Sequence, residues 1–156
     1  MQNSYFDTGY ARVGEQDVPF VKTVVQNRFS MYVPESFQED TSLAYRYTYL
    51  SNRGKSPLGI ALRFAAVSSK QAREKMRVNY LGPEEDCSYT SGQDGSFILY
   101  HETLNKGEKL SIYSLRFSVD MADGLLLGCF NTLADYRDDW KEVVLHMLES
   151  MEEKND

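Results

Sequence analysis

Three consecutive strand-like segments in the second half of the chain restrict its fold more than any other feature. FILYHETL (97–104), KLSIYSLRFSVDM (109–121) and LLLGCFNT (125–132) are rich in β-branched and aromatic residues, and only NKGE and MADG join them. A connection of a few residues can reverse a strand, but it cannot carry the chain back to start a parallel one. The sequence therefore predicts an antiparallel meander and argues against a sheet built from βαβ units.

The rest of the chain adds strands and two helices. Further strand-like segments occur at 9–14, 19–25, 27–37, 42–52 and 58–68, separated by short polar or proline-containing turns. Helical spacing predicts one helix over 69–81, which Gly82 and Pro83 end. A second amphipathic helix is predicted over 135–152, with Trp140 at the centre of its apolar face.

This order of elements is typical of an α+β protein. We predict an antiparallel β-sheet flanked by two helices, formed as one sheet of about five to seven strands. A chain of 156 residues fits one domain, and 42% hydrophobic residues are enough for a core. We therefore assign residues 1–156 to a single α+β domain.

A row of tyrosines is the best candidate for a binding surface. In SLAYRYTYLSN, the residues Tyr45, Tyr47 and Tyr49 share one face of a strand, because side chains alternate between faces. Tyrosine is enriched where proteins contact partners. The row is interpreted either as a contact surface for another protein or as rings that pack beneath a helix.

The sequence contains no pattern typical of a catalytic or metal centre. It has no CxxC or HExxH motif, and His101 and His146 occupy positions that favour the edge of a core. Cys129, inside GLLLGCF, is interpreted as a buried structural thiol. We therefore expect no catalysis, no metal and no cofactor. One enzymatic alternative stays open, a small hydrolase that uses His101 with Glu102.

The net charge and the first residues of the sequence indicate which partners and which cellular compartment to expect. The net charge of −6 argues against nucleic acid or an anionic membrane as the main partner. The first residues lack a basic start followed by an apolar run, and no stretch of about 18 apolar residues occurs that would span a membrane. A disulfide between Cys87 and Cys129 stays possible, but we expect a cytoplasmic protein.

Two stretches of the chain resemble the PsbP-like superfamily. RFSMYVPESFQED has an F-x-x-x-x-P run before a turn with an aromatic residue. LLLGCFNTLADYRDDWKEVVLHMLESM has a strand with a glycine, a polar joint and a helix that begins with tryptophan. The residues that carry the second match are Gly128, Trp140, Leu148 and Ser150. The superfamily includes photosystem oxygen-evolving subunits, Ran-binding Mog proteins, DcrB-type proteins and adaptor chaperones of type VI secretion effectors.

The resemblance implies an antiparallel sheet between helices and a role in binding or assembly. Our leading hypothesis is a non-enzymatic protein-binding module, an adaptor or chaperone that presents a sheet face to a segment of another protein. A homodimer is also possible. The alternative is an acidic immunity-type inhibitor that blocks a basic toxin by electrostatic complementarity.

Replacing Tyr45, Tyr47 and Tyr49 together by serine tests the tyrosine row. We expect the variant to melt early, losing on the order of 2 kcal/mol or more for each ring that is buried. Thermal melts followed by circular dichroism measure this. An unchanged melt, together with loss of a partner or of self-association, would instead assign the row to recognition.

Overall fold

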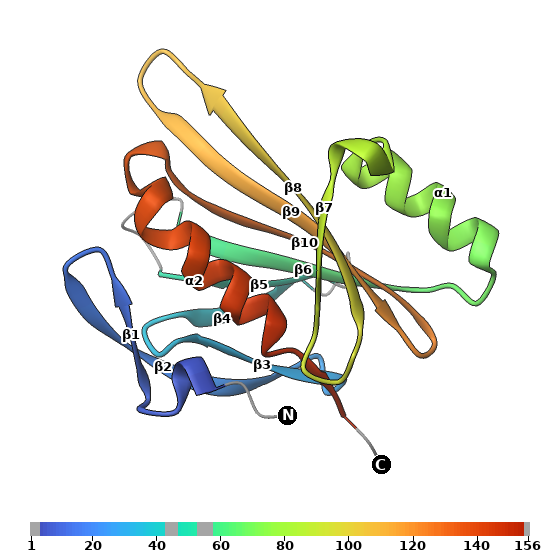
Figure 1. The fold of residues 1–156 in the computed structure, drawn as a ribbon, viewed down its shortest axis with the longest axis horizontal. Coiled ribbons are helices and arrows are strands. Elements are labelled where there is room, and N and C mark those ends of the chain that lie inside the picture. Colours follow the sequence, from blue (N-terminus) through green and yellow to red (C-terminus); the bar gives the residue numbers. More distant parts are fainter. Residues whose placement is uncertain (1–3, 43–46, 53–57, 155–156) are drawn as a thin grey trace.

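The computed structural model describes residues 4–42, 47–52 and 58–154. Its two α-helices are α1 (Lys70–Leu81) and α2 (Arg137–Glu149) (Figure 1). The strands are β1 (Tyr10–Val13), β2 (Gln16–Val25), β3 (Phe29–Pro34), β4 (Gln38–Ser42), β5 (Tyr47–Ser51), β6 (Gly59–Ala66), β7 (Ser88–Ser91), β8 (Phe97–Lys106), β9 (Ser111–Met121), β10 (Gly124–Leu133) and β11 (Glu152–Glu153). Short 3₁₀ helices lie at Ser4–Phe6, Glu84–Asp86 and Ala134–Tyr136.

The strands form two antiparallel sheets. The small sheet has the order β1-β2-β3-β11, and the large sheet has the order β4-β5-β6-β10-β9-β8-β7. The predicted α+β class, with antiparallel strands and two helices, is confirmed. The strands divide between two sheets rather than forming the single predicted one. Pro34 ends β3, and a turn closed by the Phe37 N–H on the Pro34 carbonyl oxygen (3.0 Å) leads the chain into β4 of the other sheet.

The meander predicted from the short turns is present as β8, β9 and β10. The turn between Met121 and Gly124 joins β9 to β10. β8 extends to Lys106, beyond the predicted end at 104, and the Gly107 N–H closes the next turn on the Leu110 carbonyl oxygen (2.8 Å). The β8–β9 hairpin therefore projects from the body as an arm (Figure 1).

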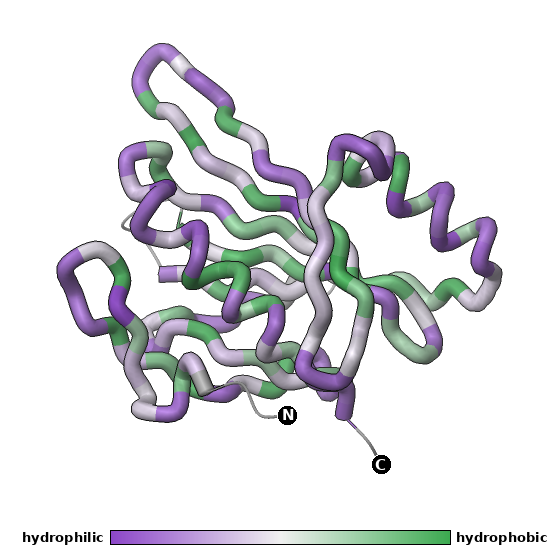
Figure 2. The backbone as a smooth tube through the Cα atoms, viewed as in Figure 1, coloured by the Kyte–Doolittle hydropathy of each residue, from purple (hydrophilic) through white to green (hydrophobic). Residues whose placement is uncertain are grey.

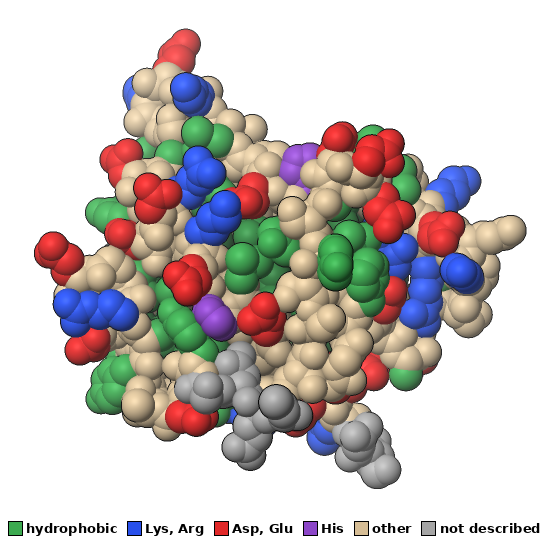
Figure 3. All heavy atoms as spheres, viewed as in Figure 1, with side chains coloured by type: hydrophobic (Ala, Val, Ile, Leu, Met, Phe, Trp, Pro, Cys, Tyr) green, Lys and Arg blue, Asp and Glu red, His purple; other side chains and the backbone are tan. Residues whose placement is uncertain are grey.

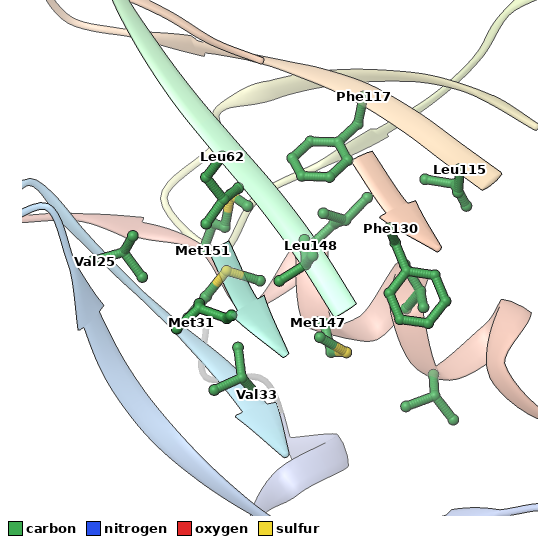
Figure 4. Packing of buried hydrophobic residues seen from close by; sticks show 14 of the residues in the cluster. Val25, Met31, Val33, Leu62, Leu115, Phe117, Phe130, Met147, Leu148 and Met151 are labelled. Atoms are coloured by element: carbon green, nitrogen blue, oxygen red, sulfur yellow. The ribbon is translucent and has the colours of Figure 1, made fainter. Parts of the chain in front are cut away.

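Helix α2 contacts strands of both sheets and buries one face between them. The buried residues of this face are Trp140, Val143, Val144, Met147 and Leu148. In Figure 4, Met147 and Leu148 lie between Val33 of the small sheet and Phe130 of the large one. The buried side chains of both sheets and of α2 form one hydrophobic cluster. The large sheet is correspondingly hydrophobic along its central strands (Figure 2).

The end of α2 is coupled to the edge of the small sheet. The helix ends at Glu149, not at the predicted 152, because Ser150 turns the chain. The Ser150 hydroxyl donates to the Met147 carbonyl oxygen (2.6 Å) and accepts a bond from the Tyr32 N–H of β3 (3.0 Å). The next residues then pair with β3 as β11.

Helix α1 is attached to the large sheet mainly by polar contacts. Only Leu81 of this helix is buried. The sequence predicts an apolar row of Ala72, Met76 and Tyr80, but Ala72 is exposed and the other two are half-buried. Arg73 donates to the carbonyl oxygens of Val67 (2.8 Å) and Met121 (2.9 Å), and the Tyr80 hydroxyl donates to the Gly128 carbonyl oxygen (2.8 Å). In Figure 2, α1 is largely hydrophilic.

Gly128, one of the residues that carry the PsbP-like resemblance, has a packing role. A Cβ atom at this position would overlap the ring of Phe117, which lies on the neighbouring strand β9. The absence of a side chain therefore lets the two strands and the ring pack together. Among the described residues, no helix is long and apolar enough to cross a membrane.

Replacing Trp140 by alanine should lower the free energy of unfolding by about 3–5 kcal/mol. The Trp140 side chain is 7% exposed, and its ring centroid lies 5.5 Å from that of Phe130. The matched control is Tyr136→Ala, because Tyr136 lies close by in sequence but is 51% exposed; it should cost less than about 0.5 kcal/mol. Denaturant unfolding measures both. Similar losses in the two variants would contradict the placement of Trp140 in the core.

Candidate functional site

A cleft of about 820 Å³ opens where the two sheets and the start of α2 meet. Its walls come from the β1–β2 hairpin, the turn after β3, the facing ends of β5 and β6, and the joint between β10 and α2. The described residues that line it are Val13, Gly14, Glu15, Gln16, Asp17, Val18, Pro19, Pro34, Ser36, Phe37, Asn52, Leu58, Thr132, Leu133, Tyr136, Asp139 and Trp140.

About half of the residues that line the cleft are apolar or aromatic. Trp140 and Phe37 present the edges of mostly buried rings, whereas Tyr136 is exposed. Leu58 and Pro19 add aliphatic surface. These residues suit an apolar group of a ligand, and the polar residues that make up the rest of the lining would fix the orientation of that ligand.

The charged side chains of the lining are all acidic. Glu15, Asp17 and Asp139 contribute carboxylates, and the described lining residues include no Lys, Arg or His. Arg12 lies outside the cleft and pairs with Asp17 at 3.1 Å, but both side chains are well exposed, so the pair is weak. On the face shown in Figure 3, acidic side chains also lie along α2 and the β1–β2 hairpin, together with basic ones. The net charge of the described lining residues is therefore negative.

The hairpin turn positions one of these carboxylates. Val13 pairs with Gln16, which leaves Gly14 and Glu15 as a two-residue turn, and Gly14 has a φ of +61°. A Cβ atom at Gly14 would lie 2.9 Å from Oδ2 of Asp139. Glycine thus serves both the turn and the close approach of the carboxylate.

The structure describes the predicted tyrosine row only in part. Tyr45 lies outside the described residues, and for Tyr47 the structure gives its place in β5, opposite Arg63 of β6. Tyr49 is half-buried and lies over Gly59, where a Cβ atom would come 2.8 Å from the Tyr49 hydroxyl. Burial, followed by the nearby Cys129, raises the pKa of the Tyr49 phenol. Tyr49 thus packs on its own sheet.

The structure separates the histidine and the glutamate of the hydrolase alternative. Nδ1 of His101 lies 3.0 Å from the Leu81 carbonyl oxygen, on the α1 side of the large sheet. The Glu102 carboxylate lies on the opposite face, where it accepts a bond from the Tyr113 hydroxyl (2.5 Å) and pairs with Lys141 of α2 (3.2 Å). Neighbouring residues of a strand point to opposite faces. The proposed His101–Glu102 pair is therefore not formed.

The cysteines are free thiols rather than a disulfide. Cys129 is half-buried, and burial raises its pKa although Arg116 lowers it. Burial and the carboxylates of the preceding acidic residues likewise raise the pKa of Cys87. Both side chains are therefore protonated thiols at neutral pH and poor nucleophiles.

His146 lies at the boundary position that the sequence predicts. Its ring stacks on Tyr5 with a centroid distance of 3.8 Å, and Nδ1 lies 3.4 Å from the Glu149 carboxylate.

Within the part of the chain that the structure describes, no cluster of three His, Cys, Asp or Glu side chains could hold a metal ion.

Comparison with known proteins establishes a likeness of fold alone. No protein-family model matches the chain, and no curated protein matches it. A crystal structure of a protein from Bacteroides thetaiotaomicron VPI-5482 is similar over 86% of this chain, with a TM-score of 0.64 and 9% identity. The chain spans about half of that protein, 48% of its length.

A PsbP protein also occurs among the structural neighbours, as the sequence resemblance implies. CyanoP from Synechocystis sp. PCC 6803 is similar over 90% of this chain and 96% of its own, with a TM-score of 0.43 and 8% identity. A likeness this distant carries no argument about activity. Membership of the DcrB-type or adaptor-chaperone branches stays a prediction.

The sequence predicts none of the cleft residues as a site. They come from four segments that are far apart in the chain, and no local motif connects them. The signal that was present is the acidic character of two of these segments, the EQD turn and the YRDDW helix start. Each is ordinary alone, and only the fold brings them together.

Replacing Tyr113 by phenylalanine should cost about 1.5–3 kcal/mol at neutral pH, because the bond to the Glu102 carboxylate is lost. In the unfolded chain this phenol ionises near pH 10. In the fold, burial and then Glu102 raise its pKa well above that value. The stabilisation that the Tyr113 hydroxyl gives to the fold is therefore complete below about pH 10 and is lost as the pH rises further.

The difference between the two proteins should therefore shrink above about pH 10. Denaturant unfolding at a series of pH values measures it. A difference that stays constant from neutral pH into this range would show that the Tyr113 proton is not held by the fold.

Proposed function

We propose that the protein is a non-enzymatic binding module, an adaptor or chaperone that holds a basic, partly apolar segment of another protein in the cleft. The observation that carries the proposal is the combination of an aromatic interior with carboxylates as the charged groups of the described lining. The sheet face with the tyrosine row was the surface expected from the sequence. Tyr49, folded over Gly59, favours the cleft instead.

Lysine and arginine side chains have an aliphatic stem and a charged end, and both of these parts fit such a cleft. Their aliphatic stems pack on apolar surface, here Leu58, Pro19 and the edge of Trp140, while their charged ends stay near water and carboxylates. Arginine can also bind a carboxylate such as Asp17 through two parallel hydrogen bonds. A segment that alternates basic and apolar residues would therefore use the rim and the interior together.

The lining also supports binding over catalysis. Its described residues include no His, Cys or Lys side chain, which leaves the carboxylates as the acid–base groups of the lining. The proposal includes a cytoplasmic location for the protein, which the two free thiols support.

The alternative of an acidic immunity-type inhibitor is favoured by a different observation. Acidic side chains are not confined to the cleft but extend, with basic ones among them, over α2 and the hairpin (Figure 3). An inhibitor would use this whole face against a basic toxin, so binding would depend on total charge rather than on particular carboxylates.

A peptide-display selection against the folded protein tests the proposal. Peptides with arginine or lysine next to apolar residues should be enriched, and a selected peptide is then measured by calorimetry. The double variant Glu15→Gln/Asp17→Asn should bind it about three- to tenfold more weakly, since each rim ion pair contributes modestly.

The matched control is Glu84→Gln/Glu85→Gln, which removes the same charge from exposed residues of a 3₁₀ helix outside the lining. Binding by this control and by Tyr49→Ser should be unchanged. Equal weakening by both double variants would favour the charge-based inhibitor. Loss of binding in Tyr49→Ser alone would move the site to the sheet face.

A further inference from the structure

One edge of β8 is paired over only part of its length. On one side, β9 pairs with β8 from Ile98 to Lys106. On the other side, β7 pairs with it only from Phe97 to Tyr100. No described strand lies beside the rest of that edge, 101–106, which belongs to the projecting arm (Figure 1). An unpaired strand edge is a template for another strand.

Hydrogen bonding at the two ends of β8 shows which backbone groups face this edge. Across the β7–β8 turn the Gly92 N–H donates to Ser96 (2.8 Å), and across the β8–β9 turn the Gly107 N–H donates to Leu110 (2.8 Å). Bonded and non-bonded pairs alternate along an antiparallel ladder, so even-numbered residues of β8 bond toward β7 and odd-numbered ones toward β9. The unpaired groups of the free edge belong to Glu102, Leu104 and Lys106.

We propose that a second copy of this chain occupies this edge, antiparallel to β8 about a two-fold axis at Leu104. Leu104 then lies opposite Leu104 of the second copy, and Glu102 lies opposite Lys106 of the second copy. Both are hydrogen-bonded pairs, because all of these residues are even-numbered. The two large sheets become one continuous sheet with an isologous contact.

Other symmetric registers bring unfavourable side chains together. An axis at Glu102 or at Lys106 places like charges opposite each other, which is destabilising. An axis at Thr103 or at Asn105 places Leu104 opposite a charged side chain. Only the axis at Leu104 matches opposite charges and buries the leucine against itself. The strand is thus complementary to itself in a single register.

The side chains of the arm are suited to this contact. Leu104 is 43% exposed, although it is large and apolar. The Glu102 carboxylate is already held by Tyr113 and Lys141, so little of its freedom is lost when Lys106 of the second copy approaches. A lysine on an edge strand can prevent pairing, but opposite Glu102 its charge favours pairing.

Sedimentation of the full chain over a range of concentrations tests the proposal. The mass should rise from 17.9 kDa toward twice that value. Lys106→Glu places a glutamate opposite Glu102 and should weaken the dimer about tenfold or more. Lys109→Glu makes the same charge change in the turn between β8 and β9, away from the paired residues, and should leave the dimer intact.

The variant Leu104→Pro tests the proposal independently. It replaces the Leu104 side chain, and the one backbone N–H that it removes points to the free edge, so the variant should keep its circular dichroism spectrum and sediment as a monomer. A wild-type protein that stays at 17.9 kDa at every concentration would overturn the proposal and leave the edge to a different partner. Equal effects of the two lysine variants, or a dimer that survives Leu104→Pro, would also overturn it.

Discussion

Side-chain packing on α2 joins two sheets that share no strand ladder. Each sheet has an apolar face toward α2, and neither sheet could bury that face on its own. The apolar row of α2, with Trp140 at one end and Leu148 near the other, fills the space between them. Ser150 then fixes where the helix stops and delivers β11 to the edge of β3. The cleft lies at the Trp140 end of this helix, beside the β1–β2 hairpin and the turn after β3.

The opposite face of the large sheet is covered in a different way. There α1 is held by arginine and tyrosine side chains that bond to backbone oxygens and to Asp120, with one buried leucine. Polar contacts of this kind specify where a helix lies, but they bury little apolar surface and so contribute less stability than α2 does. Away from α1, this face carries small residues, and Tyr49 lies over Gly59. That arrangement explains how a tyrosine can face away from α2 without forming an open aromatic stripe.

The elements that the sequence predicts well are those determined by local pattern. The meander follows from two short turns, and α2 follows from apolar residues at helical spacing, because each signal is contained within a few residues. The division into two sheets depends on Pro34 and on a strand formed by Glu152 and Glu153, which has no apolar alternation to reveal it. The prediction of a buried apolar row on α1 is wrong, because this helix is attached to the sheet through its arginines. The cleft could not be predicted, since its residues come together only after the sheets have packed on α2.

The acidic start of α2 shows why a structural and a functional interpretation can both apply to one motif. Asp138 and Asp139 stand in the first turn, where the helix dipole favours negative charge by about 0.3–1 kcal/mol each. That contribution alone accounts for YRDDW as a stable helix start. The fold then assigns the two carboxylates different surroundings, because Asp138 is exposed whereas Asp139 is half-buried against Gly14 and lines the cleft. The Asp139 carboxylate therefore both supports the helix start and adds negative charge to the cleft lining. A cationic segment that enters would meet a carboxylate held in place by packing on the hairpin turn, and a held group loses less entropy on binding than a mobile one.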